Sequence, residues 1–279
     1  MNKKKHNIIF IYEGVKTEED LLNNMAKTFF SDRADISILN CPADGNIYML
    51  WTRLKKDEFE TNVIDVLKEM SSIARTRLKD CKASDFSEIY LFFDYDGHSN
   101  NIPREYMRMD ILEEMLKTFQ NETEFGKLYI SYPMVESLKE IDAETMDYQR
   151  LYLSLDEIPT YKHSFLAKSD FGQYRYMNEK HWLIACYASL KRASLLAKYS
   201  NCCTYEYFIY NLGQEKLYWY QKQHYINNGY LLCILNSVPL FLLEYFEKDF
   251  WDNIFFVLLI KQKKDADILL RLCYENNKQ

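Results

Sequence analysis

Carboxylates stand at the ends of two apolar segments of the chain. Glu13 directly follows residues 8–12, and Asp94 and Asp96 follow residues 89–93. Buried parallel strands are typically continuous apolar runs, and open α/β sheets bind ligands beyond the carboxyl ends of their strands. The two-residue spacing in a strand places both aspartates on one side, where oxygen ligands suit Mg²⁺ or Mn²⁺. This pattern favours a metal-dependent phosphodiester enzyme, although an ordinary solvated turn has the same residue types.

Two glutamates extend the candidate carboxylate set. A Glu that ends a buried strand is unfavourable unless it is hydrated, paired or bound to metal, so Glu13 is a candidate metal ligand and proton relay. Glu136 comes shortly after a third apolar segment, residues 128–131, and is a candidate fourth carboxylate for a second metal. The alternative is a turn residue for Glu13, and for Glu136 a first-turn acid favoured by the helix dipole.

Basic residues near these acids are candidates for phosphate contacts. Lys16 follows the first acidic strand end, and the alternative for it is an ordinary surface lysine. Lys162 lies in the polar stretch Tyr161-Lys162-His163, for which a surface position is the alternative. His98 is next to the aspartate pair and is a further candidate. The sequence has no Ser-His-Asp arrangement, phosphate-binding P-loop or GxGxxG motif.

The elements that must position these residues alternate between strand and helix. We expect strands over residues 8–12, 36–39, 89–96 and 128–131. We expect helices over residues 17–29, 47–54, 63–78 and 106–119, the first of them capped by Thr17 and opening with acids. This alternation predicts an α/β fold with a parallel sheet flanked by helices and right-handed crossovers.

The pattern changes after about residue 142, where helices dominate. We expect them over residues 179–199, 214–226, 230–246 (broken near Pro239) and 254–272. We therefore predict an α/β domain over residues 1–145 and a mainly helical C-terminal region over residues 146–279. The apolar run 230–245 is shorter than the roughly 20 residues of a membrane span and contains Asn236, Pro239 and Glu244, so we expect a core segment.

Composition limits the function classes. The 279 residues are 48% hydrophobic, which is ample for a packed core, and the net charge of −6 disfavours nonspecific nucleic-acid binding unless a partner or a local basic patch supplies affinity. Seven cysteines without CxxC spacing indicate reduced thiols in a cytoplasmic protein and argue against structural zinc. The apolar stretch after the basic start is too short for a signal-peptide core, and we expect no membrane association. The aromatic-rich helical region is compatible with a homodimer interface.

Taken together, the short motifs resemble the Toprim fold, and most closely its RloB-like branch, which is related to OLD-family nucleases and found among bacterial defence genes. The motifs are Glu13-Gly14-Val15-Lys16-Thr17-Glu18, Asp94-Tyr95-Asp96, Pro133-Met134-Val135-Glu136 and the pair Tyr161-Lys162. The resemblance covers residues 6–165, and this chain has Leu138-Lys139 where that branch has a tryptophan. It implies Mg²⁺ on the paired aspartates, and acid–base chemistry or metal binding by Glu13.

The expected function is therefore a Mg²⁺-dependent nuclease acting on DNA or RNA, with tRNA among the candidates. The resemblance implies an effector of an anti-phage system, which requires restraint by a partner such as an ATPase. The alternative is a non-catalytic regulatory or scaffold protein that keeps the Toprim shell. A tyrosine nucleophile of the topoisomerase kind ranks last, because the 23 tyrosines offer no means of choosing one.

Overall fold

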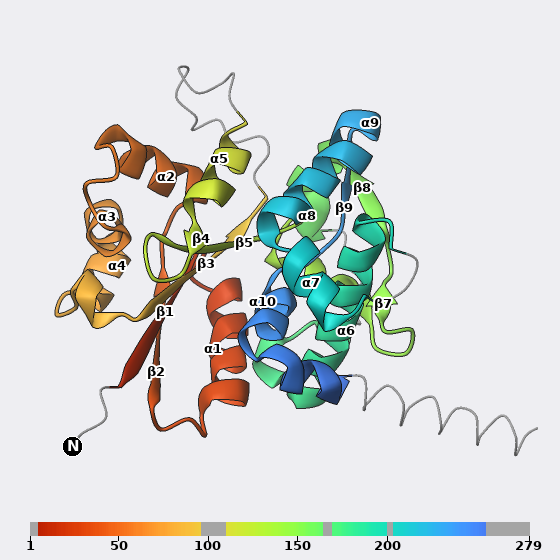
Figure 1. The fold of residues 1–279 in the computed structure, drawn as a ribbon, viewed down its shortest axis with the longest axis horizontal. Coiled ribbons are helices and arrows are strands. Elements are labelled where there is room, and N and C mark those ends of the chain that lie inside the picture. The colour runs from red at the N-terminus through yellow and green to blue at the C-terminus, as the bar shows by residue number, and fades with distance from the viewer. Residues whose placement is uncertain (1–4, 96–109, 164–168, 200–202, 255–279) are drawn as a thin grey trace, which may run out of the picture.

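The computed structural model describes residues 5–95, 110–163, 169–199 and 203–254, and it is an α/β protein built on a mostly parallel sheet (Figure 1). The five strands lie in the order β2-β1-β3-β5-β4. They are β1 (His6–Tyr12), β2 (Ile36–Pro42), β3 (Glu88–Asp94), β4 (Gln120–Asn121) and β5 (Gly126–Ser131). β2, β1, β3 and β5 run parallel, and the short β4 runs antiparallel to β5. The four expected strands are present, and β4 was not expected. The expectation that the third strand continues to residue 96 is wrong at Tyr95, because β3 ends at Asp94, and residue 96 lies outside the described residues.

The direction in which strands are added to the sheet reverses after β2, so that β1 lies between β2 and β3. Helix α1 (Thr17–Phe30) connects β1 to β2 on one side, and the chain then crosses back over β1 to reach β3. The second connection contains α2 (Ile47–Lys56), α3 (Val63–Met70) and α4 (Ser72–Arg77). Since right-handed crossovers in opposite directions require opposite faces, α1 lies on one face of the sheet and α2 to α4 on the other (Figure 1).

A single helix over residues 63–78 was predicted, and this prediction is wrong. Ser71 is extended, with φ −121° and ψ 128°, and separates α3 from α4. Its hydroxyl accepts a hydrogen bond from the N–H of Ala74 at 3.1 Å, so Ser71 acts as a side-chain cap for α4. Helix α5 (Ile111–Thr118) agrees with the later part of the helix expected over residues 106–119, whose first residues lie outside the described chain.

The C-terminal region is mainly helical, as expected. It contains α6 (Glu179–Leu196), α7 (Tyr205–Asn211), α8 (Gln214–Gln221), a π-helical turn (Lys222–Ile226), α9 (Asn227–Gly229) and α10 (Val238–Tyr245). The expectation of a helix from residue 230 is wrong, because β9 (Leu231–Cys233) pairs with β8 (Tyr152–Ser154). Pro239 lies in the first turn of α10, where its missing N–H has no cost. Most of the helix expected over residues 254–272 lies outside the described residues.

Helix α10 packs on the central sheet, next to α1 (Figure 1). The ring of Phe241 contacts four aromatic rings of β1, β3 and β5 at centroid distances of 4.8 to 5.6 Å: Phe10, Tyr90, Phe92 and Tyr129. A single hydrophobic core therefore extends from the sheet into the C-terminal region. The division at residue 145 stays a prediction, and the hairpin of β6 (Ile141–Asp142) and β7 (Asp147–Tyr148) spans it.

None of the described helices combines the length and apolar character required to cross a membrane. The cysteines described as free thiols are Cys41, Cys81, Cys186, Cys203 and Cys233.

Candidate active site

Two acidic strand ends meet where the order of the strands reverses. Tyr12 of β1 pairs in parallel register with Phe92 of β3, Glu13 follows Tyr12, and Asp94 ends β3. Side chains at this switch point face the crevice in which open α/β sheets bind ligands. The structure thus places Glu13 and Asp94 on adjacent strand ends.

The Asp94 carboxylate is held by the loop that follows β5. Its Oδ1 accepts a hydrogen bond from the N–H of Val135 at 2.8 Å. Burial raises the pKa of Asp94 well above its ordinary value, and the negative charges of Glu13, Glu18 and Glu136 raise it further. Four carboxylates therefore interact in one place, at the end of three adjacent parallel strands.

Glu136 is the most enclosed acid of this group. It lies in a 3₁₀ helix (Val135–Glu140) that follows β5, and it is only 6% exposed. Its Oε1 is 3.4 Å from the Nζ of Lys162. Its Oε2 is buried and accepts no hydrogen bond from any residue that the structure describes. A buried carboxylate oxygen without a donor is costly, and a bound cation would remove that cost.

Lys162 supplies positive charge to the acidic group. Burial opposes its charged form, but the carboxylates of Glu136, Asp94 and Glu18 more than compensate and raise its pKa. The alternative of a surface position for Tyr161-Lys162-His163 agrees with the exposed Lys162 but is wrong for Tyr161, which is 1% exposed and packs against the guanidinium of Arg150 at 5.2 Å. Burial of the tyrosine fixes the segment that carries Lys162.

Glu18 was missed as a site residue. It is 8% exposed, and its Oε1 accepts a hydrogen bond from the N–H of Gly14 at 3.1 Å. Burial raises its pKa, with a further increase from Glu136. A Cβ at residue 14 would lie 2.8 Å from Oε2 of Glu18, so the glycine allows this close approach. The motif Glu13-Gly14-x-x-Thr17-Glu18 contained the signal, but Glu18 reads from sequence alone as a first-turn helix acid.

The expectation that Thr17 caps α1 is wrong. The helix already begins at Thr17, and the preceding Lys16 occupies the N-cap position without a side-chain hydrogen bond. The hydroxyl of Thr17 is therefore within the first turn instead of preceding it. The side-chain contact at this helix start is the one from Glu18 back to Gly14.

The two candidate phosphate contacts occupy different places. Both lysines are exposed, but Lys162 contacts the acidic group, whereas Lys16 lines a cleft of 380 Å³ together with Lys139 and Arg175. Two further candidates, Asp96 and His98, lie outside the described residues.

Within the described part of the chain, no cluster of three or more His, Cys, Asp or Glu side chains has the geometry of a metal site. The predicted ligand set of Glu13, Asp94 and Asp96 is therefore not seen as a unit, since Asp96 is not described. Mg²⁺ commonly uses one or two carboxylates and keeps several waters or substrate oxygens. The donor chemistry at Asp94 and Glu136, all carboxylate oxygen, fits that mode of binding.

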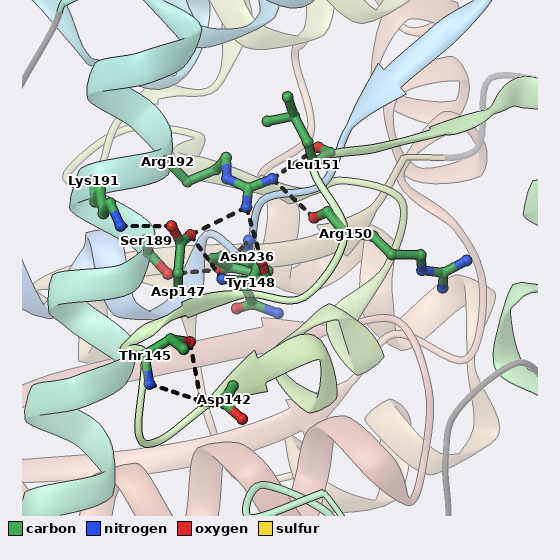
Figure 2. Close-up of polar contacts among 10 residues, drawn as sticks. All are labelled: Asp142, Thr145, Asp147, Tyr148, Arg150, Leu151, Ser189, Lys191, Arg192 and Asn236. Atoms are coloured by element: carbon green, nitrogen blue, oxygen red, sulfur yellow. Dashed lines mark hydrogen bonds and ion pairs between the residues drawn. The ribbon is translucent and has the colours of Figure 1, made fainter.

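A residue far away in the sequence holds the segment around Glu136. The side-chain amide of Asn236 donates to the carbonyl of Val135 at 2.8 Å and lies 3.1 Å from the hydroxyl of Ser137. Asn236 is fully buried, and its own N–H donates to the hydroxyl of Tyr148 at 3.0 Å (Figure 2). The hydroxyl of Tyr174 also donates to the carbonyl of Val135, at 3.2 Å. These contacts make Asn236 a positioning residue, and its presence in an apolar run was the available sequence signal.

Comparisons with known proteins identify no relative. No protein-family model matches the chain, and no curated protein or solved structure is significantly similar to it.

Proposed function

We propose that this chain is a Mg²⁺-dependent nuclease of the Toprim type that hydrolyses phosphodiester bonds of DNA or RNA. The observation that supports it best is the carboxylate group formed by Glu13, Asp94 and Glu136 at the ends of adjacent parallel strands. Burial raises the pKa of the half-buried Asp94, and repulsion from Glu13, Glu18 and Glu136 raises it further. A fold tolerates such repulsion more readily where a divalent cation relieves it.

The proposed roles follow from position. Asp94 and Glu136 hold the metal, with Mn²⁺ able to replace Mg²⁺, and Asp96, which lies outside the described residues, is a further proposed ligand. A bound divalent cation supplies positive charge that stabilises the developing charge on a phosphate. Glu13 transfers a proton to or from the attacking or leaving oxygen and contributes to the metal site.

The proposed biological setting follows from the resemblance of the motifs to the RloB-like branch. We propose an effector of a bacterial anti-phage system, held in check by a partner such as an ATPase. The net charge of −6 supports dependence on a partner or on a local basic surface for nucleic-acid affinity.

A cleavage assay tests the proposal. Purified protein is incubated with pooled DNA and pooled RNA, including tRNA, in Mg²⁺, in Mn²⁺ or in EDTA. Wild type is compared with Glu13→Gln, Asp94→Asn and the control Asp32→Asn, which removes an exposed carboxylate just beyond the opposite end of α1.

We expect metal-dependent cleavage by wild type and by the control. Asp94→Asn should slow cleavage about 10³-fold, because a lost metal ion removes several kcal/mol of stabilisation of the transition-state charge. Loss of proton transfer predicts a decrease of about 10²- to 10⁴-fold for Glu13→Gln. Equal cleavage by all four proteins would contradict the assignment. No cleavage by wild type, together with full cellular activity of Asp94→Asn, would support the regulatory or scaffold alternative.

A further inference from the structure

A basic cleft adjoins the acidic group. It has a volume of 380 Å³ and lies between the start of α1 and residues 172–176. Tyr174 forms part of its wall and also hydrogen bonds to the carbonyl of Val135, the residue before Glu136. The charges of Glu136 and Asp94 contribute, after burial, to the raised pKa of Tyr174, so this wall lies next to the acids.

The charge of the cleft is opposite to that of the whole chain. Lys16, Lys139 and Arg175 line it, against the single carboxylate of Asp20. Asp20 is 2.8 Å from the Nε of Arg175, and three cationic side chains thus line the cleft against one carboxylate. In a chain of net charge −6, such a local excess attracts a phosphate-bearing ligand.

The cleft also carries an exposed aromatic ring and a fixed wall. Tyr176 lines the cleft and is 75% exposed, so its ring is accessible to a ligand. The backbone beneath it is held by Asn24 of α1, whose side-chain amide donates to the carbonyls of Arg175 and Met177 at 3.1 and 2.9 Å. Trp182 donates in turn to the Asn24 side-chain oxygen at 2.8 Å. The ring is therefore presented by a buried hydrogen-bond network and not by a loose loop.

We propose that this cleft binds single-stranded nucleic acid, with a base stacked on Tyr176 and backbone phosphates near Lys16 and Lys139. This inference rests on the proposed nuclease function, because it names the form of the substrate and the path by which a strand reaches the acids. A single strand is required, since a base can stack on an exposed tyrosine only when it is free of its own helix. Cations that follow the backbone together with aromatic stacking are the usual means of binding single strands.

Binding measured without metal separates this inference from catalysis. The probes are fluorescein-labelled oligo(dT) and oligo(U) of about 12 nucleotides, a usual site size for such grooves, and a duplex of the same length. Fluorescence anisotropy in EDTA reports affinity for wild type, Tyr176→Ala and Lys16→Gln. The matched controls are Tyr210→Ala, at a 74% exposed tyrosine of α7, and Lys27→Gln, at the opposite end of α1.

We expect both single strands to bind more tightly than the duplex. Tyr176→Ala should weaken binding about 5- to 100-fold, and Lys16→Gln should reduce the slope of log affinity against log salt by about 0.7 for one lost phosphate contact. Both controls should bind as wild type does. Preference between the DNA and RNA probes then identifies the substrate class.

The inference is overturned if no single strand binds, if the duplex binds equally well, or if Tyr176→Ala and Tyr210→Ala behave alike. Cleavage by wild type with unchanged kcat/KM in the cleft variants would also overturn it while the nuclease proposal stands. Strand binding that depends on Tyr176, with no cleavage in any metal, would support the cleft and refute the nuclease.

Discussion

Two groups of charged side chains in this protein are balanced in opposite ways. Around Asp147, the Nζ of Lys191 lies at 2.6 Å and the guanidinium of the buried Arg192 at 3.1 Å (Figure 2). Burial opposes the charge of Asp147, but these two cations more than compensate and lower its pKa. Around Asp94, burial and three further carboxylates raise the pKa. At Asp147 the carboxylate is balanced by two cations, whereas at Asp94 four carboxylates face the single cation Lys162.

The surroundings of Arg192 show what a structural charge network requires. Besides Asp147, its guanidinium donates to the backbone carbonyls of Tyr148, Arg150 and Leu151 at 2.8 to 3.3 Å (Figure 2). The network ties β7 and the following residues to α6. By contrast, one oxygen of Glu136 accepts no hydrogen bond from the described residues. A buried carboxylate oxygen without a hydrogen-bond donor is expected where a ligand supplies the missing contact.

The largest expected effect is an opposite change in stability when each aspartate is made neutral. Asp147→Asn should lower the free energy of unfolding by about 2–3 kcal/mol, because the 4% exposed Arg192 loses its carboxylate; the 30% exposure of Asp147 keeps the loss below that of a fully buried pair. Asp94→Asn should raise the free energy of unfolding, because burial and the neighbouring carboxylates disfavour the charged form of Asp94 and raise its pKa. Urea unfolding at neutral pH without metal measures both. Destabilisation by both variants would remove the distinction between the two groups.

The same comparison predicts different dependence on pH. The pKa of Asp94 is raised in the folded state. Its carboxyl group therefore has no effect on stability below the pKa of the unfolded chain, about 3.9, and it lowers the free energy of unfolding as pH rises from there to the folded-state pKa. Asp147 has a lowered pKa, so its stabilising effect is present above about 3.9 and is lost as pH falls through the folded value. The stability of wild type should therefore approach that of Asp94→Asn as pH falls from neutral. A constant difference between these two proteins from neutral pH to about pH 4 would contradict the raised pKa.

A smaller effect is expected where the two regions are connected. Asn236 is linked to Tyr148 on one side and to the segment of Glu136 on the other. Asn236→Ala should reduce kcat about 10- to 100-fold, as loss of residues that orient ligands commonly does, and should weaken activation by Mg²⁺. Titration of activity with Mg²⁺ well below the unfolding temperature separates positioning from stability. An unchanged half-saturating Mg²⁺ concentration would indicate that Asn236 only supports the fold.

The contrast also explains what the sequence could predict. Glu13 and Asp94 were identifiable because each ends an apolar run, and strand ends of a parallel sheet share one edge by geometry alone. Asn236 is about one hundred residues from Val135, and the two meet where Leu235 pairs with Tyr132 in an antiparallel bridge, a pairing that no local pattern specifies. The apolar spacing is continuous across Ser71, so it predicted one helix. The serine ends α3 and caps α4 because its hydroxyl can hydrogen bond to the backbone nearby. The strands and most helices, which depend on local patterns, were therefore predicted. The contacts between distant segments, such as that of Asn236 with Val135, were missed.

The smallest effect concerns the close approach of Gly14 to Glu18. In Gly14→Ala the new Cβ would lie 2.8 Å from the carboxylate of Glu18, a flexible group that can move aside and lose its hydrogen bond from Gly14. We expect little change in unfolding free energy and a decrease in kcat of about 2- to 10-fold, the equivalent of one hydrogen bond. The control is Gly213→Ala, where a Cβ meets nothing within 4 Å.

A double-mutant cycle shows whether this decrease acts through Glu18. Removal of the carboxylate in Glu18→Ala removes the group with which the new Cβ collides, so Gly14→Ala should have no further effect in that background. Additive losses would mean that Gly14 matters for another reason, such as the path of the chain from Glu13 into α1. Non-additive losses would place Glu18 with Asp94 and Glu136 in the group whose shared negative charge distinguishes it from the balanced network at Asp147.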